Sequence, residues 1–339
     1  MFKALFNFLV KYFKRIFAAL ATSAAIGTAS ITSAVISIPS SSEEFVATEY
    51  DVSVSAVAMC NLAAESAVGS VKEIFINNMD LDENKVSGWS HIVEGTDDND
   101  FSYALWVNKY ENTTYCLSFA GSDTLEDTLD YLPMEISESR SSQTHSAAEK
   151  TKELKERIET LNQDNPEKYG TLENLYICGH SLGGYLAMYI ASDIVDSALG
   201  YTNTIVSLDD LGWSEYAGED LTNLSEKLHC FTFGAPGMHC KGEPLGLKIT
   251  EWQKQKIEID KQNKYDDIII QYCNSKDPVC NLLYPFLDHI GTKMYYQAPI
   301  VSFTIRYEIY KKNKTLFASG AAFTFAYYHL PWVYINIIS

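Results

Sequence analysis

The residues best suited to chemistry in this chain are Gly179, His180, Ser181 and Gly183, which follow the spacing G-x-S-x-G. In this pattern the serine stands on a sharp turn between a strand and a helix, and its hydroxyl projects outward. The flanking glycines lack Cβ atoms and let the two elements approach closely. The helix N-terminus favours a developing oxyanion. The spacing therefore predicts a nucleophilic serine at position 181, within an elbow formed by the other three residues.

The neighbouring sequence supplies the two elements that this turn requires. Residues 172–178 form an apolar, strand-like run, residues 179–184 are expected to form a tight turn, and residues 185–195 form an apolar helix. The same glycines could in principle form a phosphate-binding loop, but no Gly-Lys-Ser/Thr follows them. The strand–turn–helix order therefore favours the nucleophile.

The rest of the chain alternates between strands and helices, which predicts an α/β fold with a mostly parallel sheet. A hairpin is expected from strands at 101–108 and 114–119, because turn-forming asparagines lie between them. No linker interrupts the sequence, so residues 45–339 are expected to form a single domain. The remaining expected elements are helices at 52–76, 146–162 and 249–264, strands at 228–233 and 267–272, a late strand or hairpin at 296–310, and an acidic surface insertion at 208–227.

The composition excludes some partners. The chain has 339 residues and a formal net charge of −18, with 46% hydrophobic residues. A surface this acidic repels phosphate backbones, so nucleic acid is not expected as a partner. It also argues against docking onto anionic lipid by charge alone.

Residues 1–44 differ from the remainder of the chain. Four basic residues precede an uncharged stretch at 16–38, and a polar run follows at 39–44. A basic start followed by an apolar stretch and small residues favours a secretory signal peptide. The uncharged stretch is also long enough for a retained membrane anchor, and an amphipathic helix is a third possibility. The protein is therefore expected to be secreted or associated with the cell envelope.

The chain contains seven cysteines and no CxxC pair, so zinc and redox motifs are absent from the sequence. Cys116, Cys178 and Cys230 lie in apolar runs and are expected to be inert core thiols. Cys273 and Cys280 could form a disulfide if the protein is exported.

Beyond the elbow, the sequence resembles the class 3 (fungal-type) lipase family and its bacterial relatives. The matching segments occur in the family's order and extend over residues 55–339; they are LSFAGSDTLEDTLD at 117–130, GHSLGG at 179–184, FTFGAPG at 231–237 and NSKDPV at 274–279. The resemblance implies an α/β-hydrolase fold, with a mostly parallel central sheet and helices on both faces. It implies no cofactor and no metal.

The resemblance also implies roles for particular residues. Asp277 would be the acid of a catalytic triad, and the backbone N–H groups of Ser122 and Leu182 would form the oxyanion hole. Residues 124–132 fall where the family has a lid helix; an ordinary amphipathic surface helix is the alternative. One departure is Ala120, because the family usually has an arginine before the oxyanion glycine. That difference affects local packing more than chemistry.

Two of the seven histidines, His289 and His329, follow Asp277 and could be the base in the order Ser, Asp, His. His329 lies in YYHLPWVY, which resembles the late family element that carries the base. His289 lies in LDHIGT, which resembles an H-x-G element that is not usually the base. His329 is therefore favoured, and His289 is the alternative.

Together these features predict a serine carboxylic ester hydrolase that acts through an acyl-enzyme on Ser181. The resemblance favours a lipase acting on acylglycerols or related lipid esters, with a possible lipid interface. The alternatives are a phospholipase A, an esterase of small esters, and a non-catalytic lipid-binding module on a hydrolase scaffold. A serine peptidase would use the same triad, but the lipase-like segments around Ser122 and Gly234 count against it.

Overall fold

The computed structural model describes residues 89–96, 101–121, 142–240, 251–275, 277, 279–280 and 287–296. Several predictions lie outside these residues and are not tested by the structure. They concern the N-terminal segment 1–44, the helix at 52–76, Ser122, the lid at 124–132, the late strand or hairpin at 296–310 beyond Tyr296, and His329.

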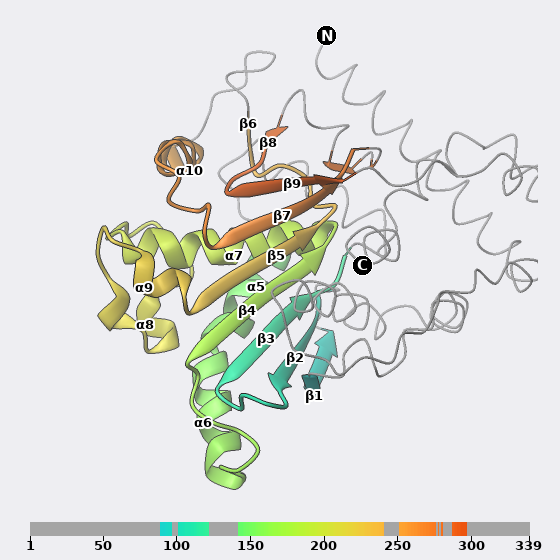
Figure 1. Ribbon diagram of the computed structural model, residues 1–339, viewed down its shortest axis with the longest axis vertical. Coiled ribbons are helices and arrows are strands. Elements are labelled where there is room, and N and C mark those ends of the chain that lie inside the picture. The colour runs from blue at the N-terminus through green and yellow to red at the C-terminus, as the bar shows by residue number, and fades with distance from the viewer. Residues whose placement is uncertain are drawn as a thin grey trace, which may run out of the picture.

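A seven-stranded sheet forms the centre of the part of the chain that the structure describes (Figure 1). Its strands, in spatial order, are β1 (Trp89–Thr96), β2 (Ser102–Asn108), β3 (Thr114–Phe119), β4 (Asn174–His180), β5 (Leu228–Phe233), β7 (Ile269–Asn274) and β9 (Thr292–Tyr296). The pairs β1–β2 and β2–β3 are antiparallel, whereas every pair from β3 to β9 is parallel. The predicted α/β class with a mostly parallel sheet is confirmed.

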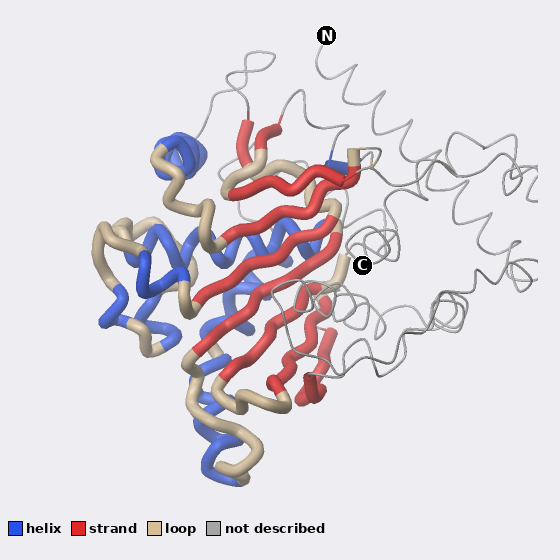
Figure 2. The backbone as a smooth tube through the Cα atoms, viewed as in Figure 1, coloured by secondary structure: helices blue, strands red, loops and turns tan. Residues whose placement is uncertain are grey.

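Helix α7 (Leu182–Ala198) packs against the centre of the sheet, and almost all of its residues are buried. Figure 2 shows helices gathered behind the strands in this view. The other described helical segments are α5 (Ser142–Lys152), α6 (Leu154–Asp164), α8 (Leu208–Leu211), η1 (Ser214–Tyr216), α9 (Thr222–Ser225) and α10 (Glu251–Lys261). A short antiparallel pair, β6 (His239–Cys240) with β8 (Leu287–Asp288), lies apart from the main sheet. None of the helices in the described ranges is long and apolar enough to cross a membrane.

Several predicted elements are confirmed. The hairpin of β2 and β3 forms as expected, β5 has the predicted bounds, and α10 lies within the predicted helix at 249–264. The prediction for 267–272 is two residues early, because β7 ends at Asn274. The strands β1 and β9 were not predicted.

Three predictions of local structure are wrong in part. The turn at 179–184 is far shorter than expected, because β4 continues to His180 and α7 begins at Leu182. The helix at 146–162 is divided into α5 and α6 at Glu153. The acidic stretch 208–227 is not merely a surface insertion, since its apolar residues enter the core; these are Leu208, Leu211, Trp213, Leu221 and Leu224.

A fully buried ion network joins α10 to α7. The Nζ atom of Lys256 lies 3.0 Å from Oδ1 of Asp193 and 2.8 Å from Oδ2 of Asp196, and all three side chains are 0% exposed. Lys256 also donates to the Ser192 hydroxyl at 2.8 Å, and the Tyr265 hydroxyl donates to Oδ1 of Asp196 at 2.6 Å. Because isolated buried charges are very costly, these mutual contacts offset the cost of burying the three charged groups.

Asp260, at the end of α10, contacts the segment that leads into β9. Its Oδ1 accepts a hydrogen bond from the Gly291 N–H at 2.8 Å. Burial raises the pKa of this carboxyl from 3.8 to about 6, against the opposing effects of that hydrogen bond and of Lys293. The folded protein therefore holds the carboxyl proton of Asp260 more tightly than the unfolded chain does. As a result, the contribution of Asp260 to the free energy of unfolding falls as the pH rises from about 4 to about 6.

Asp260→Asn is expected to increase the free energy of unfolding at pH 7.5 by about 1 kcal/mol, because the asparagine can accept the same hydrogen bond without carrying a charge. At pH 5 the difference from the wild type should be smaller. Urea unfolding at both pH values measures it, with Asp267→Asn, an exposed carboxylate nearby, as the control. Equal stability of Asp260→Asn and wild type at pH 7.5 would contradict this account.

Candidate active site

Ser181 is the single residue between the end of β4 and the start of α7, and its backbone has φ 58° and ψ −125°. A positive φ is rare for a residue with a Cβ and costs about 1–3 kcal/mol. Ser181 is half-buried, in contrast to the buried residues on either side. The backbone thus has the strained geometry that presents a serine hydroxyl at the end of a strand.

The elbow glycines explain how so short a turn can close. A Cβ on Gly179 would lie 2.1 Å from the carbonyl carbon of Gly183. A Cβ on Gly183 would lie 2.3 Å from the Phe119 carbonyl oxygen and 2.5 Å from that of Ala120. All of these neighbours are backbone atoms, which cannot rotate away. Glycine is therefore required at both positions so that β4, α7 and the end of β3 can approach one another.

Two neighbouring strands hold the nucleophile from either side. The Ser181 N–H donates to the Phe233 carbonyl at the end of β5, at 2.9 Å. On the other side, an added Cβ on Gly121, just after β3, would lie 3.2 Å from the Ser181 Cβ. The segment FTFGAPG was noted from the sequence, but the role of the Phe233 carbonyl was not predicted, because a backbone acceptor leaves no mark on residue type.

Of the two predicted oxyanion residues, Leu182 lies within the described part of the chain and Ser122 does not. Leu182 is the first residue of α7, so its N–H is one of those that an α-helix leaves without an i−4 acceptor. Ser122 lies outside the described residues, but the residue before it, Gly121, lies against the elbow. His180 is buried within the elbow, as expected for a residue at the end of β4.

Asp277 follows the carboxyl end of β7 and is 0% exposed. Its N–H donates to the Asn274 carbonyl at 2.9 Å, and its Oδ1 accepts from the Val279 N–H at 2.8 Å. The strands β4 and β7 are parallel and have only β5 between them, so Ser181 and Asp277 leave the same edge of the sheet. Two strand spacings amount to about 10 Å, a gap that an imidazole from another segment could bridge.

His289 is buried beside β7, and its ring lies between two oxygen atoms. Its Nδ1 lies 2.6 Å from Oε1 of Gln271, and its Nε2 lies 3.4 Å from the Cys280 carbonyl oxygen. A general base must turn one ring nitrogen toward the serine hydroxyl and the other toward the acid. The two oxygen atoms beside the His289 ring belong to the Gln271 amide and to the Cys280 backbone. His329 lies outside the described residues.

The expectation for the core thiols is confirmed, because Cys116, Cys178 and Cys230 are fully buried thiols. The Sγ atoms of Cys116 and Cys178 lie 3.5 Å apart across β3 and β4. Burial raises the pKa of the Cys116 and Cys230 thiols well above the usual range, so both stay protonated and unreactive. Cys273 and Cys280 are thiols as well, so the disulfide considered for them is not formed.

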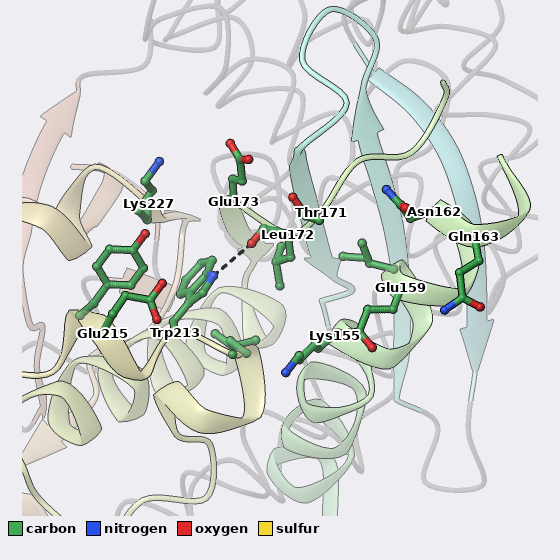
Figure 3. Close-up of a pocket in the computed structure, with 14 residues that line it drawn as sticks. Lys155, Glu159, Asn162, Gln163, Thr171, Leu172, Glu173, Trp213, Glu215 and Lys227 are labelled. Atoms are coloured by element: carbon green, nitrogen blue, oxygen red, sulfur yellow. Dashed lines mark hydrogen bonds between the residues drawn. The ribbon is translucent and has the colours of Figure 1, made fainter. Parts of the chain in front are cut away.

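A pocket at the opposite edge of the sheet is distinct from this site (Figure 3). Leu172 and Glu173, just before β4, and Lys227, just before β5, line it at the amino ends of these strands. The Trp213 indole N–H donates to the Leu172 carbonyl at 3.1 Å, and both residues line the pocket. Because parallel α/β sheets bind ligands beyond the carboxyl ends of their strands, the edge with Ser181 and Asp277 is the candidate active site. No group of three potential metal-ligating side chains occurs in the part of the chain that the structure describes.

No family model matches this chain, and no curated protein sequence matches it. Several solved lipase structures are similar to it in shape. The lipase of Rhizopus microsporus var. chinensis is 15% identical, with 78% of this chain and 80% of that chain covered and a TM-score of 0.41. Lipase II of Rhizopus niveus is 14% identical, with coverages of 74% and 82% and a TM-score of 0.41.

A bacterial structure is similar to the same degree. The extracellular lipase of Serratia marcescens is 14% identical, with 85% of this chain and 50% of that chain covered and a TM-score of 0.39. Identities and TM-scores this low concern the general fold and assign no role to any residue. The case for the site therefore rests on the geometry around Ser181.

Proposed function

We propose that this protein is a serine carboxylic ester hydrolase with Ser181 as its nucleophile. The observation that carries the proposal is the backbone of Ser181, a strained non-glycine residue between β4 and α7 with φ 58°. Strain of this kind persists only where the surrounding structure imposes it, and it concentrates at functional sites. Here Gly179, Gly183 and the Phe233 carbonyl impose it.

The proposed mechanism assigns each step to a residue. The Oγ atom of Ser181 attacks the ester carbonyl while His329 takes its proton, and Asp277 stabilises the resulting imidazolium. The N–H groups of Leu182 and Ser122 stabilise the tetrahedral oxyanion, which is usually the largest electrostatic contribution. The alcohol leaves with the proton from His329. Water, deprotonated by the same histidine, then releases the acid from Ser181.

The proposal of a lipase rests on the sequence resemblance, and acylglycerols are the proposed substrates. Purified full-length protein is expected to hydrolyse p-nitrophenyl butyrate. With tributyrin, the rate should rise more steeply with concentration above the solubility limit of the ester than below it. Such an increase at the interface would support a lid at residues 124–132. Rates that saturate below the solubility limit would identify a small-ester esterase. No hydrolysis of either substrate would contradict the proposed activity and favour the lipid-binding module.

A further inference from the structure

We propose that His289 and Gln271 are positioning residues that hold the loop carrying Asp277 against β7. The inference rests on the proposed function, because it gives Asp277 the role of the catalytic acid. It concerns two buried polar side chains that the proposed mechanism does not otherwise use. Gln271 is 0% exposed and His289 is 1% exposed.

The orientation of Gln271 determines how the pair interacts. Its Nε2 donates to the Ile290 carbonyl, which can only accept a hydrogen bond. Its Oε1 must therefore face His289, and the 2.6 Å contact requires a proton on Nδ1 of the histidine. Gln271 belongs to β7 within the main sheet, so this bond fixes the imidazole ring on the rigid part of the fold.

The opposite edge of the imidazole meets the acid loop. Its Nε2 lies 3.4 Å from the carbonyl oxygen of Cys280, three residues after Asp277; with the proton of the neutral ring on Nδ1, this is a packing contact. The Cys280 thiol in turn contacts the carbonyl oxygens of Asn274 at 3.6 Å and of Asp277 at 3.7 Å. The imidazole ring therefore packs against the loop that carries Asp277. Removal of the ring would leave the Cys280 end of that loop without this packing contact.

The backbone of the histidine is itself anchored. The His289 N–H donates to Oδ1 of Asp288 at 3.0 Å, and the Lys293 ammonium lies 2.8 Å from the same oxygen. On the loop, Asp277 is tied at its own N–H to Asn274 and at its Oδ1 to the Val279 N–H. Gln271 of β7 and Asp288 of β8 thus hold the histidine, Lys293 of β9 pairs with Asp288, and the histidine packs against the loop.

A displaced acid has a specific kinetic consequence. If the Asp277 carboxylate moves, it stabilises the imidazolium of the base less, and the apparent pKa of that base falls. Orientation errors of about 1 Å can lower turnover on the order of 100-fold. A positioning defect should therefore reduce kcat, leave KM nearly unchanged, and move the acidic limb of the pH–rate profile to lower pH.

The test uses full-length wild type, His289→Ala and His289→Asn with p-nitrophenyl butyrate. His289→Ala is expected to lower kcat about 10- to 100-fold with KM nearly unchanged, to shift the acidic limb downward, and still to react at Ser181 with a fluorophosphonate probe. His289→Asn should recover part of the rate, since its amide can donate to Gln271 in place of Nδ1. The matched control is His229→Ala, which removes a half-buried histidine near the amino end of β5 and should leave the pH profile unchanged.

Two results would overturn the inference. Wild-type kcat and pH profile in His289→Ala would show that the ring does not position the loop. Activity as low as that of Ser181→Ala in a folded His289→Ala protein, with no reaction at Ser181, would make His289 the base itself. If His289→Ala does not fold, the same readouts on His289→Asn and Gln271→Met decide the question. A wild type that reacts with neither ester nor probe would instead refute the proposed function, so the two failures are distinguishable.

Discussion

Ser181→Ala is expected to reduce the turnover of p-nitrophenyl butyrate by at least about 10⁴-fold, because a triad enzyme without its nucleophile retains only the contribution of its oxyanion hole and binding site. The substitution removes one hydroxyl and leaves the backbone geometry unchanged. The circular dichroism spectrum and the free energy of unfolding should therefore remain close to those of the wild type.

A glycine at the same position separates the chemistry from the strain. Ser181→Gly should be equally inactive, but it should raise the free energy of unfolding by about 1 kcal/mol, because glycine adopts a positive φ without steric cost. Urea unfolding of the three proteins at one pH measures this difference. If Ser181→Gly were no more stable than Ser181→Ala, the backbone of Ser181 would not be strained in the way described.

Lys256→Met is expected to destabilise the fold by about 3–5 kcal/mol, because it leaves Asp193 and Asp196 buried without their cation. Burial already raises the pKa of Asp193 in the wild type, and the Lys256 ammonium opposes that effect. Without the ammonium, the pKa of the Asp193 carboxyl should rise further. The deficit of the variant should therefore be largest at neutral pH and shrink as the pH falls, since the folded variant then takes up protons.

The same helix offers a matched control. Lys254 forms an exposed pair with Glu251, where the two side chains are 57% and 85% exposed. Lys254→Met should change stability by no more than about 0.5 kcal/mol. In the background of Asp193→Asn and Asp196→Asn, Lys256→Met should cost less than it does alone, because no buried carboxylate is left unpaired. A similar cost in both backgrounds would mean that lost packing, not charge, explains the effect.

The sequence predicted the site best where residue type and backbone geometry are directly coupled. The glycines around Ser181 are required by contacts between backbone atoms, so the motif GHSLG specifies the elbow. Asp277 was located by resemblance alone, and the structure places it at the same sheet edge as Ser181. The extent of the turn was overestimated because Gly183 and Gly184, which normally disfavour helix, lie in the first turn of α7.

Features that depend on tertiary contacts were not predicted. Lys256 lies in a helix rich in lysine and glutamine, a composition typical of solvent-exposed helices, yet its side chain is fully buried. The sequence of α7 did indicate a buried charge, because Asp193 and Asp196 interrupt its apolar run. The bond between Gln271 and His289 joins residues 18 positions apart and could be found only from the pairing of β7 with the segment before β9.

The most direct test of the central claim is reaction of the full-length protein with a fluorophosphonate probe, followed by identification of the modified peptide by mass spectrometry. The account predicts one probe per chain, attached to Ser181, and no labelling of Ser181→Ala. Labelling that is absent from the folded wild type, or that persists in Ser181→Ala, would contradict the assignment of Ser181 as the nucleophile.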